Sequence, residues 1–182
     1  MQGNELYADL IASLVEGTRG EAKGLSPQEL AWQPDAEGNS IGVTVWHVSR
    51  WFDVVTRVFQ EKPAEDELWL TQGWAERTGY DPRGIGYRGL GALTGYTQQE
   101  VAAIPTLSAE DSLAYLDQAS GALRAYLLAL PSFEALHEPL PAWSEKVPVN
   151  KEQLLKTVFM GCAGHLGEIK ALKAMMKRAQ VA

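Results

Sequence analysis

The stretch that decides the fold is NKEQLLKTVFMGCAGHLGEIKALKAMMKR, residues 150–178. Its apolar side chains recur at three- and four-residue steps, which is the spacing of one face of an α-helix. They are Leu155, Val158, Phe159, Cys162, Ile169, Leu172 and Met176. His165 falls on the same face, so an ionisable ring is predicted to point toward the core. The pattern indicates one long helix, which begins at a capping box formed by Asn150 and Gln153.

Three further segments carry helical periodicity. Residues 4–23 place aliphatic side chains on one face and stop near Gly24, a residue type favoured just past a helix end. Residues 40–60 have a broad apolar face, and residues 108–130 repeat leucine at helical spacing until Pro131. No alternating run is long enough to indicate a sheet. The sequence therefore predicts an all-α protein with four long helices.

The segment between the second and third predicted helices, from about Pro63 to Pro105, differs in composition. Glycines alternate there with tryptophans and tyrosines. The glycines favour turns, and the aromatic rings need a surface on which to pack. Two interpretations stay open: the insert is a functional cap over a site, or it is a structural crosslink over the open end of the bundle.

Length, charge and cysteine content bound the class of protein. A chain of 182 residues is expected to form one domain over residues 1–182. The net charge of −7, without a basic stripe, argues against a nucleic-acid partner. The single cysteine, Cys162, excludes an intramolecular disulfide and fits a reducing compartment. The sequence has neither a membrane-spanning apolar run nor a signal-peptide pattern at its start, so we expect a cytoplasmic protein without a membrane partner.

Two histidines on different predicted helices form the candidate site. His47 lies on the inward face of the second predicted helix, and His165 lies on that of the fourth. Helix bundles hold divalent metals through side chains that project inward, and imidazole is a ligand for zinc, nickel and iron. A third ligand one turn before His165 would stand at position 161, which is glycine. The alternative is two core rings, each hydrogen-bonded to a neighbour, whereas His137 is expected in a surface loop.

Two neighbours of His165 are candidates for completing a metal site. Cys162 and Glu168 lie three residues before and after it, on roughly the same helical face. Each also has a simpler interpretation. A buried cysteine packs as a small hydrophobe, and a glutamate near a helix surface is solvated or ion-paired. The sequence does not decide between these interpretations.

Three pieces of the chain carry a family resemblance. Residues 25–32 read LSPQELAW, residues 40–42 read SIG at the entry to the helix with Trp46 and His47, and residues 165–169 read HLGEI. Together they resemble the DinB-like family, which includes YfiT-like hydrolases and thiol-dependent transferases. The resemblance covers nearly the whole chain. It implies an up-down-down-up four-helix bundle with an aromatic, glycine-rich insert between the second and third helices, and a homodimer formed through the long helices.

The resemblance also implies a metal centre. In the family pattern, a histidine of the second helix and an H-x-x-x-H pair of the fourth bind a divalent metal. His47 matches the first position and His165 the last, while the middle position falls on Gly161, which has no side chain to donate. The chain thus keeps two of three expected ligands, and a zinc, nickel or iron ion would be weakly bound or absent.

Two functions compete on these grounds. In the first, the protein has a degenerate metal site and binds a small molecule, or a protein partner, at a pocket between the second and fourth helices. Trp46, Trp51 and the aromatic insert would line that pocket. In the second, the protein is a metal-dependent hydrolase or a thiol-dependent transferase. Water, Cys162 or Glu168 would then supply the third ligand. Whether the protein is an enzyme, and on which substrate, is not decided by the sequence.

Overall fold

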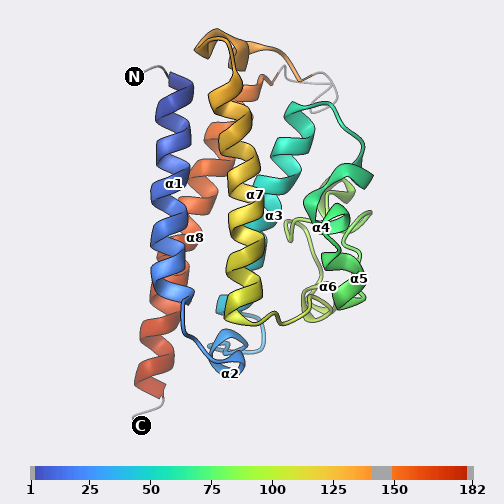
Figure 1. Cartoon of the computed structure of the whole chain (residues 1–182). Coiled ribbons are helices and arrows are strands. Elements are labelled where there is room, and N and C mark those ends of the chain that lie inside the picture. Colours follow the sequence, from blue (N-terminus) through green and yellow to red (C-terminus); the bar gives the residue numbers. More distant parts are fainter. Residues whose placement is uncertain (1–2, 141–148, 180–182) are drawn as a thin grey trace.

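The computed structural model describes residues 3–140 and 149–179. Long helices lie side by side in a bundle (Figure 1), and they are α1 (Gly3–Ala22), α3 (Ile41–Phe59), α7 (Ala109–Ala129) and α8 (Lys151–Ala179). α1 and α8 run from the upper to the lower end of Figure 1, and α3 and α7 run the opposite way. The described ranges contain no strand, apart from one isolated antiparallel bridge between Pro139 and Asn150. The predicted all-α fold is confirmed.

Side-chain caps fix where the helices begin. In the short helix α2 (Pro27–Leu30), Ser26 and Glu29 form a capping box, because each side chain bonds the backbone of the other. Asn150 and Gln153 do the same at the start of α8, with distances of 2.9 and 2.8 Å. These bonds satisfy backbone N–H groups that the first helical turn leaves without a partner. The predicted capping box at the start of the last long helix is therefore confirmed.

The insert between α3 and α7 folds into short helices and turns. They are η1 (Ala64–Asp66), α4 (Leu68–Thr71), α5 (Trp74–Thr78), η2 (Tyr87–Gly89) and α6 (Gln98–Ala102). Figure 1 shows this segment, in green, along the flank of α3 and α7 rather than across an end of the bundle. The interpretation as a crosslink over the open end is therefore wrong in its placement. The aromatic rings of the insert find their packing surface on the sides of the helices.

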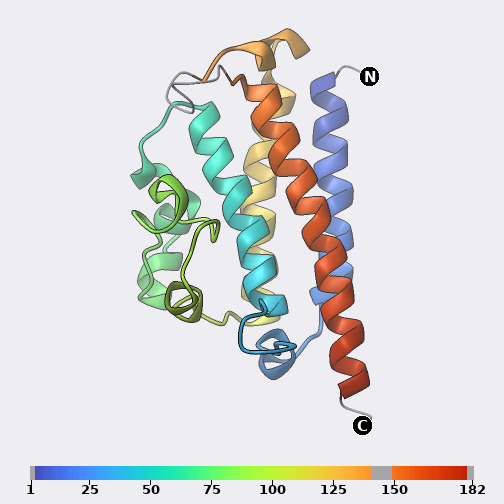
Figure 2. The same ribbon diagram turned by 180° about the vertical axis from the view of Figure 1, so that it is seen from behind.

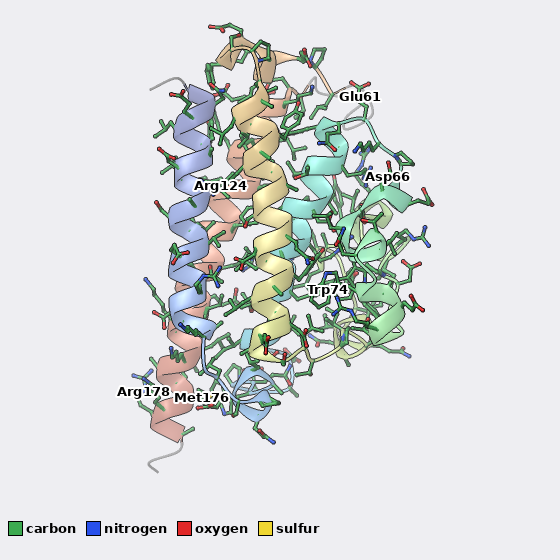
Figure 3. The ribbon with its side chains drawn as sticks, in the orientation of Figure 1. Glu61, Asp66, Trp74, Arg124, Met176 and Arg178 are labelled. Atoms are coloured by element: carbon green, nitrogen blue, oxygen red, sulfur yellow. The ribbon has the colours of Figure 1, made fainter. Side chains whose placement is uncertain are left out.

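Aromatic packing attaches the insert to the bundle. Trp69 is fully buried, and its ring centroid lies 5.9 Å from that of Trp46 on α3 and 5.0 Å from that of Tyr115 on α7. Trp74 points from α5 toward α7 (Figure 3), where its indole N–H donates to Gln118 at 2.8 Å. Buried rings of this kind contribute large apolar area, and the indole is satisfied by a polar partner. The insert is thereby part of the core.

A buried ionic cluster provides a second attachment. Arg50 of α3 is fully buried, and its guanidinium donates to Asp53, to Glu67 and to the hydroxyl of Tyr115 at 2.7–3.2 Å. It also donates to the backbone carbonyl of Gly91 at 3.0 Å. A buried charge is tolerated only when it is paired and hydrogen-bonded. Arg50 meets that condition by bonding the insert at two places, Glu67 near its start and Gly91 in its interior.

Glycine is required where Arg50 meets the insert. Gly91 has a φ of 62°, and a Cβ atom there would collide with the carbonyl oxygen of Pro82. Only glycine adopts this backbone without a steric penalty. The composition of the insert thus has a structural cause at this position.

The rest of the core is mainly aliphatic, and all of the long helices contribute to it. Ile11 of α1, Val48 of α3, Leu123 of α7 and Ile169 of α8 are fully buried. Among the described residues, no helix is both long and apolar enough to cross a lipid bilayer. The bundle instead presents its apolar faces to one another, as the sequence periodicity indicates.

Candidate functional site

The two predicted histidines lie side by side. α3 and α8 pack against each other (Figure 2), and they bring the ring centroids of His47 and His165 to 4.5 Å, with the planes at 81°. His47 is 6% exposed, whereas the side chain of His165 is 27% exposed. Two residues separated by more than a hundred positions therefore form one imidazole pair at the helix interface.

Glu168 holds the ring of His165. Its Oε2 lies 2.7 Å from Nδ1 of His165, one helical turn away. The hydrogen bond to His165 is the main cause that lowers the pKa of Glu168, and Asn39 acts in the same direction. Because an ionised carboxylate only accepts hydrogen bonds, the shared hydrogen lies on Nδ1, and Nε2 is the nitrogen that remains for another partner. Glu168 orients His165 rather than standing free in solvent.

His47 is kept uncharged by its surroundings. Burial lowers its pKa to about 4, and the neighbouring His165 adds to the fall, while the backbone of Ala92 opposes it. Nδ1 of His47 is buried, and within the described ranges no hydrogen bond of normal geometry reaches it. One nitrogen of His47 is thus left without a partner among the described residues, although buried polar nitrogens are normally paired.

Cys162 has the properties of a core residue. It is 1% exposed, and burial raises the pKa of its thiol to about 12. The thiolate, which is the form that binds metals and attacks electrophiles, is thus strongly disfavoured. This environment matches the interpretation of Cys162 as a small buried hydrophobe.

The residues present do not fit a tightly held metal ion. In the part of the chain that the structure describes, no group of three or more His, Cys, Asp or Glu side chains is placed to hold one. Neither Cys162 nor Glu168 therefore forms such a group with the two histidines. At the middle position of the family pattern, a Cβ atom on Gly161 would meet nothing within 4 Å. The position is open space rather than a ligand.

That open space belongs to a cavity of about 590 Å³ between α3, α8 and the insert. α8 lines it with two columns of residues, each spaced by four and therefore stacked along the helix. The polar column is Gln153, Thr157, Gly161 and His165, and the apolar column is Leu154, Val158 and Cys162. The remaining lining residues are His47, Trp51, Tyr87, Thr94 and Val149.

Of the two tryptophans predicted to line the pocket, one does so and the other does not. Trp51 lines the cavity, as predicted. Trp46 does not: it is 2% exposed, and its ring packs on Trp69 and Tyr80 at centroid distances of 5.9 and 6.0 Å. The prediction for Trp46 is wrong because it directly precedes His47, and adjacent helical residues point about 100° apart. Trp46 faces the insert while His47 faces α8.

The third histidine lies outside the site. His137 ends the short helix η3 (Phe133–His137), its side chain is 48% exposed, and Nε2 lies 3.6 Å from a carboxylate oxygen of Glu152. Its predicted surface position is confirmed. Sequence reasoning missed Thr157 and Gln153, although their four-residue spacing from Gly161 and His165 was a usable signal.

An all-α bundle with an imidazole pair and a cavity between two of its long helices defines the structural class. Within that class, the chain belongs to the DinB superfamily, whose family model matches residues 15–169. The fold is also similar to a crystal structure described as the conserved protein of locus from Enterococcus faecalis. The TM-score is 0.81, the identity is 17%, and 96% of this chain and 97% of that chain are covered. A search of curated proteins finds no match.

Proposed function

We propose that this protein binds a small, largely apolar molecule in the cavity between α3 and α8, with the imidazole pair as its polar anchor. The observation that carries the proposal is the continuity of the cavity with the backbone of α8 at Gly161. Position 161 is the one at which the family pattern has a metal-binding side chain. In this chain the glycine leaves room there for a small molecule. A volume of about 590 Å³ is within the range of small-molecule sites.

The lining supports an uncharged ligand. Trp51, Leu154 and Val158 provide apolar contact area, and the described residues that line the cavity include no lysine, arginine, aspartate or glutamate. His47 adds no positive charge near neutral pH, because burial holds its pKa at about 4. A strongly anionic molecule would therefore lose its hydration without gaining a cationic partner.

The test is binding of N-phenyl-1-naphthylamine, an uncharged probe whose fluorescence rises in apolar surroundings. Gly161→Leu places a side chain in the cavity and is expected to weaken binding by at least about tenfold, through the loss of contact area. Gly164→Leu is the matched control, since Gly164 lies on the same helix, is equally open and does not line the cavity. Equal binding by the parent and by Gly161→Leu would refute the proposal.

A metal-dependent hydrolase or thiol-dependent transferase is the second candidate. It is favoured by one observation: Nδ1 of His165 is held by a carboxylate, as in many metal-ligating histidines. With two protein ligands, water would supply the remaining coordination. Elemental analysis of protein purified without a metal-affinity tag tests this candidate. Near-stoichiometric zinc, nickel or iron would favour it over the first proposal.

Pairing of two copies is also proposed. Exposed apolar side chains on the long helices suit such an interface, and they include Leu6 and Leu10 of α1, Leu128 of α7 and Met160 of α8. Sedimentation analysis at tens of micromolar protein is the measurement, and a purely monomeric species would exclude the dimer. A cytoplasmic location stays a prediction.

A further inference from the structure

Two side chains of α8 that flank Gly161 offer hydrogen-bond acceptors to the cavity. Thr157 stands one turn before Gly161 in the polar column of α8, and His165 stands one turn after it. The hydroxyl hydrogen of Thr157 is donated to the carbonyl oxygen of Gln153 at 2.9 Å. What Thr157 has left for a ligand is an oxygen lone pair.

His165 offers an acceptor as well. Its Nδ1 faces the carboxylate of Glu168 at 2.7 Å and carries the shared hydrogen, so Nε2 is the nitrogen that can accept from a ligand. A carboxylate behind the ring increases the electron density at Nε2 and strengthens it as an acceptor. The gap over Gly161 is thus flanked along α8 by two acceptors.

Ligands that cannot donate a hydrogen bond do not complement this end of the cavity. An ether or a carboxylate would cover Nε2 of His165 without donating a hydrogen bond to it, and a polar atom removed from water without a new partner is costly. Carboxylates face the further cost that no lysine or arginine is found among the described residues that line the cavity. A neutral donor on an apolar body satisfies both conditions.

We propose that the cavity selects molecules that join an apolar, ring-containing body to one neutral hydroxyl of the phenol type, which donates its hydrogen bond to Nε2 of His165 above Gly161. The body lies against the apolar column of α8 and against Trp51 and Tyr87. The inference rests on the proposed binding function and adds the chemical class of the ligand.

The test compares three probes of nearly equal apolar size at about pH 8, above the ordinary pKa of histidine. They are 2-naphthol, 2-methoxynaphthalene and 2-naphthoate, measured by titration calorimetry. The expected order of affinity is naphthol, then the methyl ether, then the carboxylate. The naphthol is expected to bind about tenfold more tightly than its ether, which is the effect of one good hydrogen bond to a polarised acceptor.

Two variants assign that preference to His165. His165→Phe keeps an aromatic ring without an acceptor and is expected to make naphthol and ether bind alike. His137→Phe is the control, because His137 is exposed and does not line the cavity. Glu168→Gln leaves His165 in place, removes the charge behind its ring and is expected to reduce the preference to an intermediate value.

The outcomes separate this inference from the proposal beneath it. If naphthol and ether bind the parent protein equally, the hydroxyl preference is refuted while small-molecule binding stands. A naphthol preference that persists in His165→Phe also overturns it, since another group would then accept the hydrogen bond. If neither the naphthalenes nor N-phenyl-1-naphthylamine binds, both proposals fail. The comparison of ligands on the parent protein decides the matter even if a variant does not fold.

Discussion

Arg50 and His165 are polar side chains in two regions of one bundle, and they differ in how fully the protein satisfies their hydrogen-bonding groups. Arg50 is fully buried and donates to two carboxylates, a phenol and two backbone carbonyls. His165 is bonded on one nitrogen and presents the other beside a cavity. Satisfied buried networks rigidify a fold, whereas a polar group left without a protein partner is available to a ligand. The difference distinguishes the structural cluster from the candidate binding site.

The largest effect is expected from breaking the Arg50 cluster. Arg50→Met would leave Asp53 and Glu67 buried with less countercharge, which is expected to cost about 3–5 kcal/mol of unfolding free energy. Urea denaturation followed by circular dichroism measures it. Arg57→Met is the control, because the side chain of Arg57 is 18% exposed and bonds Oε1 of Glu67. Arg50 bonds the other oxygen, Oε2. A loss below about 1 kcal/mol in Arg50→Met, the level of a surface ion pair, would contradict the distinction drawn between the two regions.

A pH-dependent loss of stability is expected from His47. Its pKa is about 4 in the folded protein and 6.5 ordinarily, so the unfolded chain binds the proton more readily. The free energy of unfolding is therefore expected to fall as pH drops from about 6.5 to about 4, by of order 3 kcal/mol, with no further loss from His47 below that range.

We would measure denaturation midpoints of the parent and of His47→Phe across that pH range. The difference between them separates the contribution of His47 from that of the carboxylates. The parent should lose more stability than the variant on acidification. His137→Phe removes an exposed histidine instead and should behave like the parent. Parallel curves for the parent and His47→Phe would show that burial of His47 does not shift its titration.

Rebuilding the missing ligand is expected to convert the cavity into a metal site. Gly161→His would place an imidazole one turn before His165, facing the space beside His47. Zinc at about 100 times its Kd should then stabilise the variant by about 2.7 kcal/mol, seen as a higher Tm, and should affect the parent much less.

His47→Ala in the Gly161→His background should remove the response to zinc. A response that survives this change would mean that His47 is not a ligand. The absence of any response in Gly161→His would show that the three positions do not converge on one ion.

The smallest effect is expected from Gly161→Ala. Alanine favours a helix interior over glycine by about 0.5–1 kcal/mol, and the added Cβ meets no neighbour within 4 Å. Gly164→Ala should give the same gain for the same reason. Thermal unfolding compares the two. A loss of stability in Gly161→Ala alone would indicate that the cavity tolerates no added atom.

Local patterns predicted the long helices and the imidazole pair. Caps such as Ser26 and Asn150 act within three residues, so their signal is contained in a short stretch of sequence. His47 and His165 were found because each interrupts an apolar face with an ionisable ring. A residue's own helix was enough to indicate that it points inward.

Partners distant in sequence were not predicted. Arg50 and Asp53 look like an ordinary exposed pair on a helix, and only the fold brings Glu67 and Tyr115 to them. Trp46 was misplaced because its helix is buried on more than one side, and the sequence does not say which neighbour covers which side. The position of the insert, and hence of Tyr87 in the cavity wall, depended on the same missing information.

One consequence concerns how this cavity can change over evolution. Arg50 donates to the backbone carbonyl oxygens of Leu90 and Gly91, so this attachment depends on the glycine at position 91 and not on the side chains that line the cavity. Tyr87 and Thr94, which line the cavity, do not accept these hydrogen bonds from Arg50. Exchanges at these two positions are therefore expected to alter the chemistry of the cavity wall without removing the hydrogen bonds of Arg50. The bundle is thus a constant scaffold on which the ligand preference of the cavity can diverge.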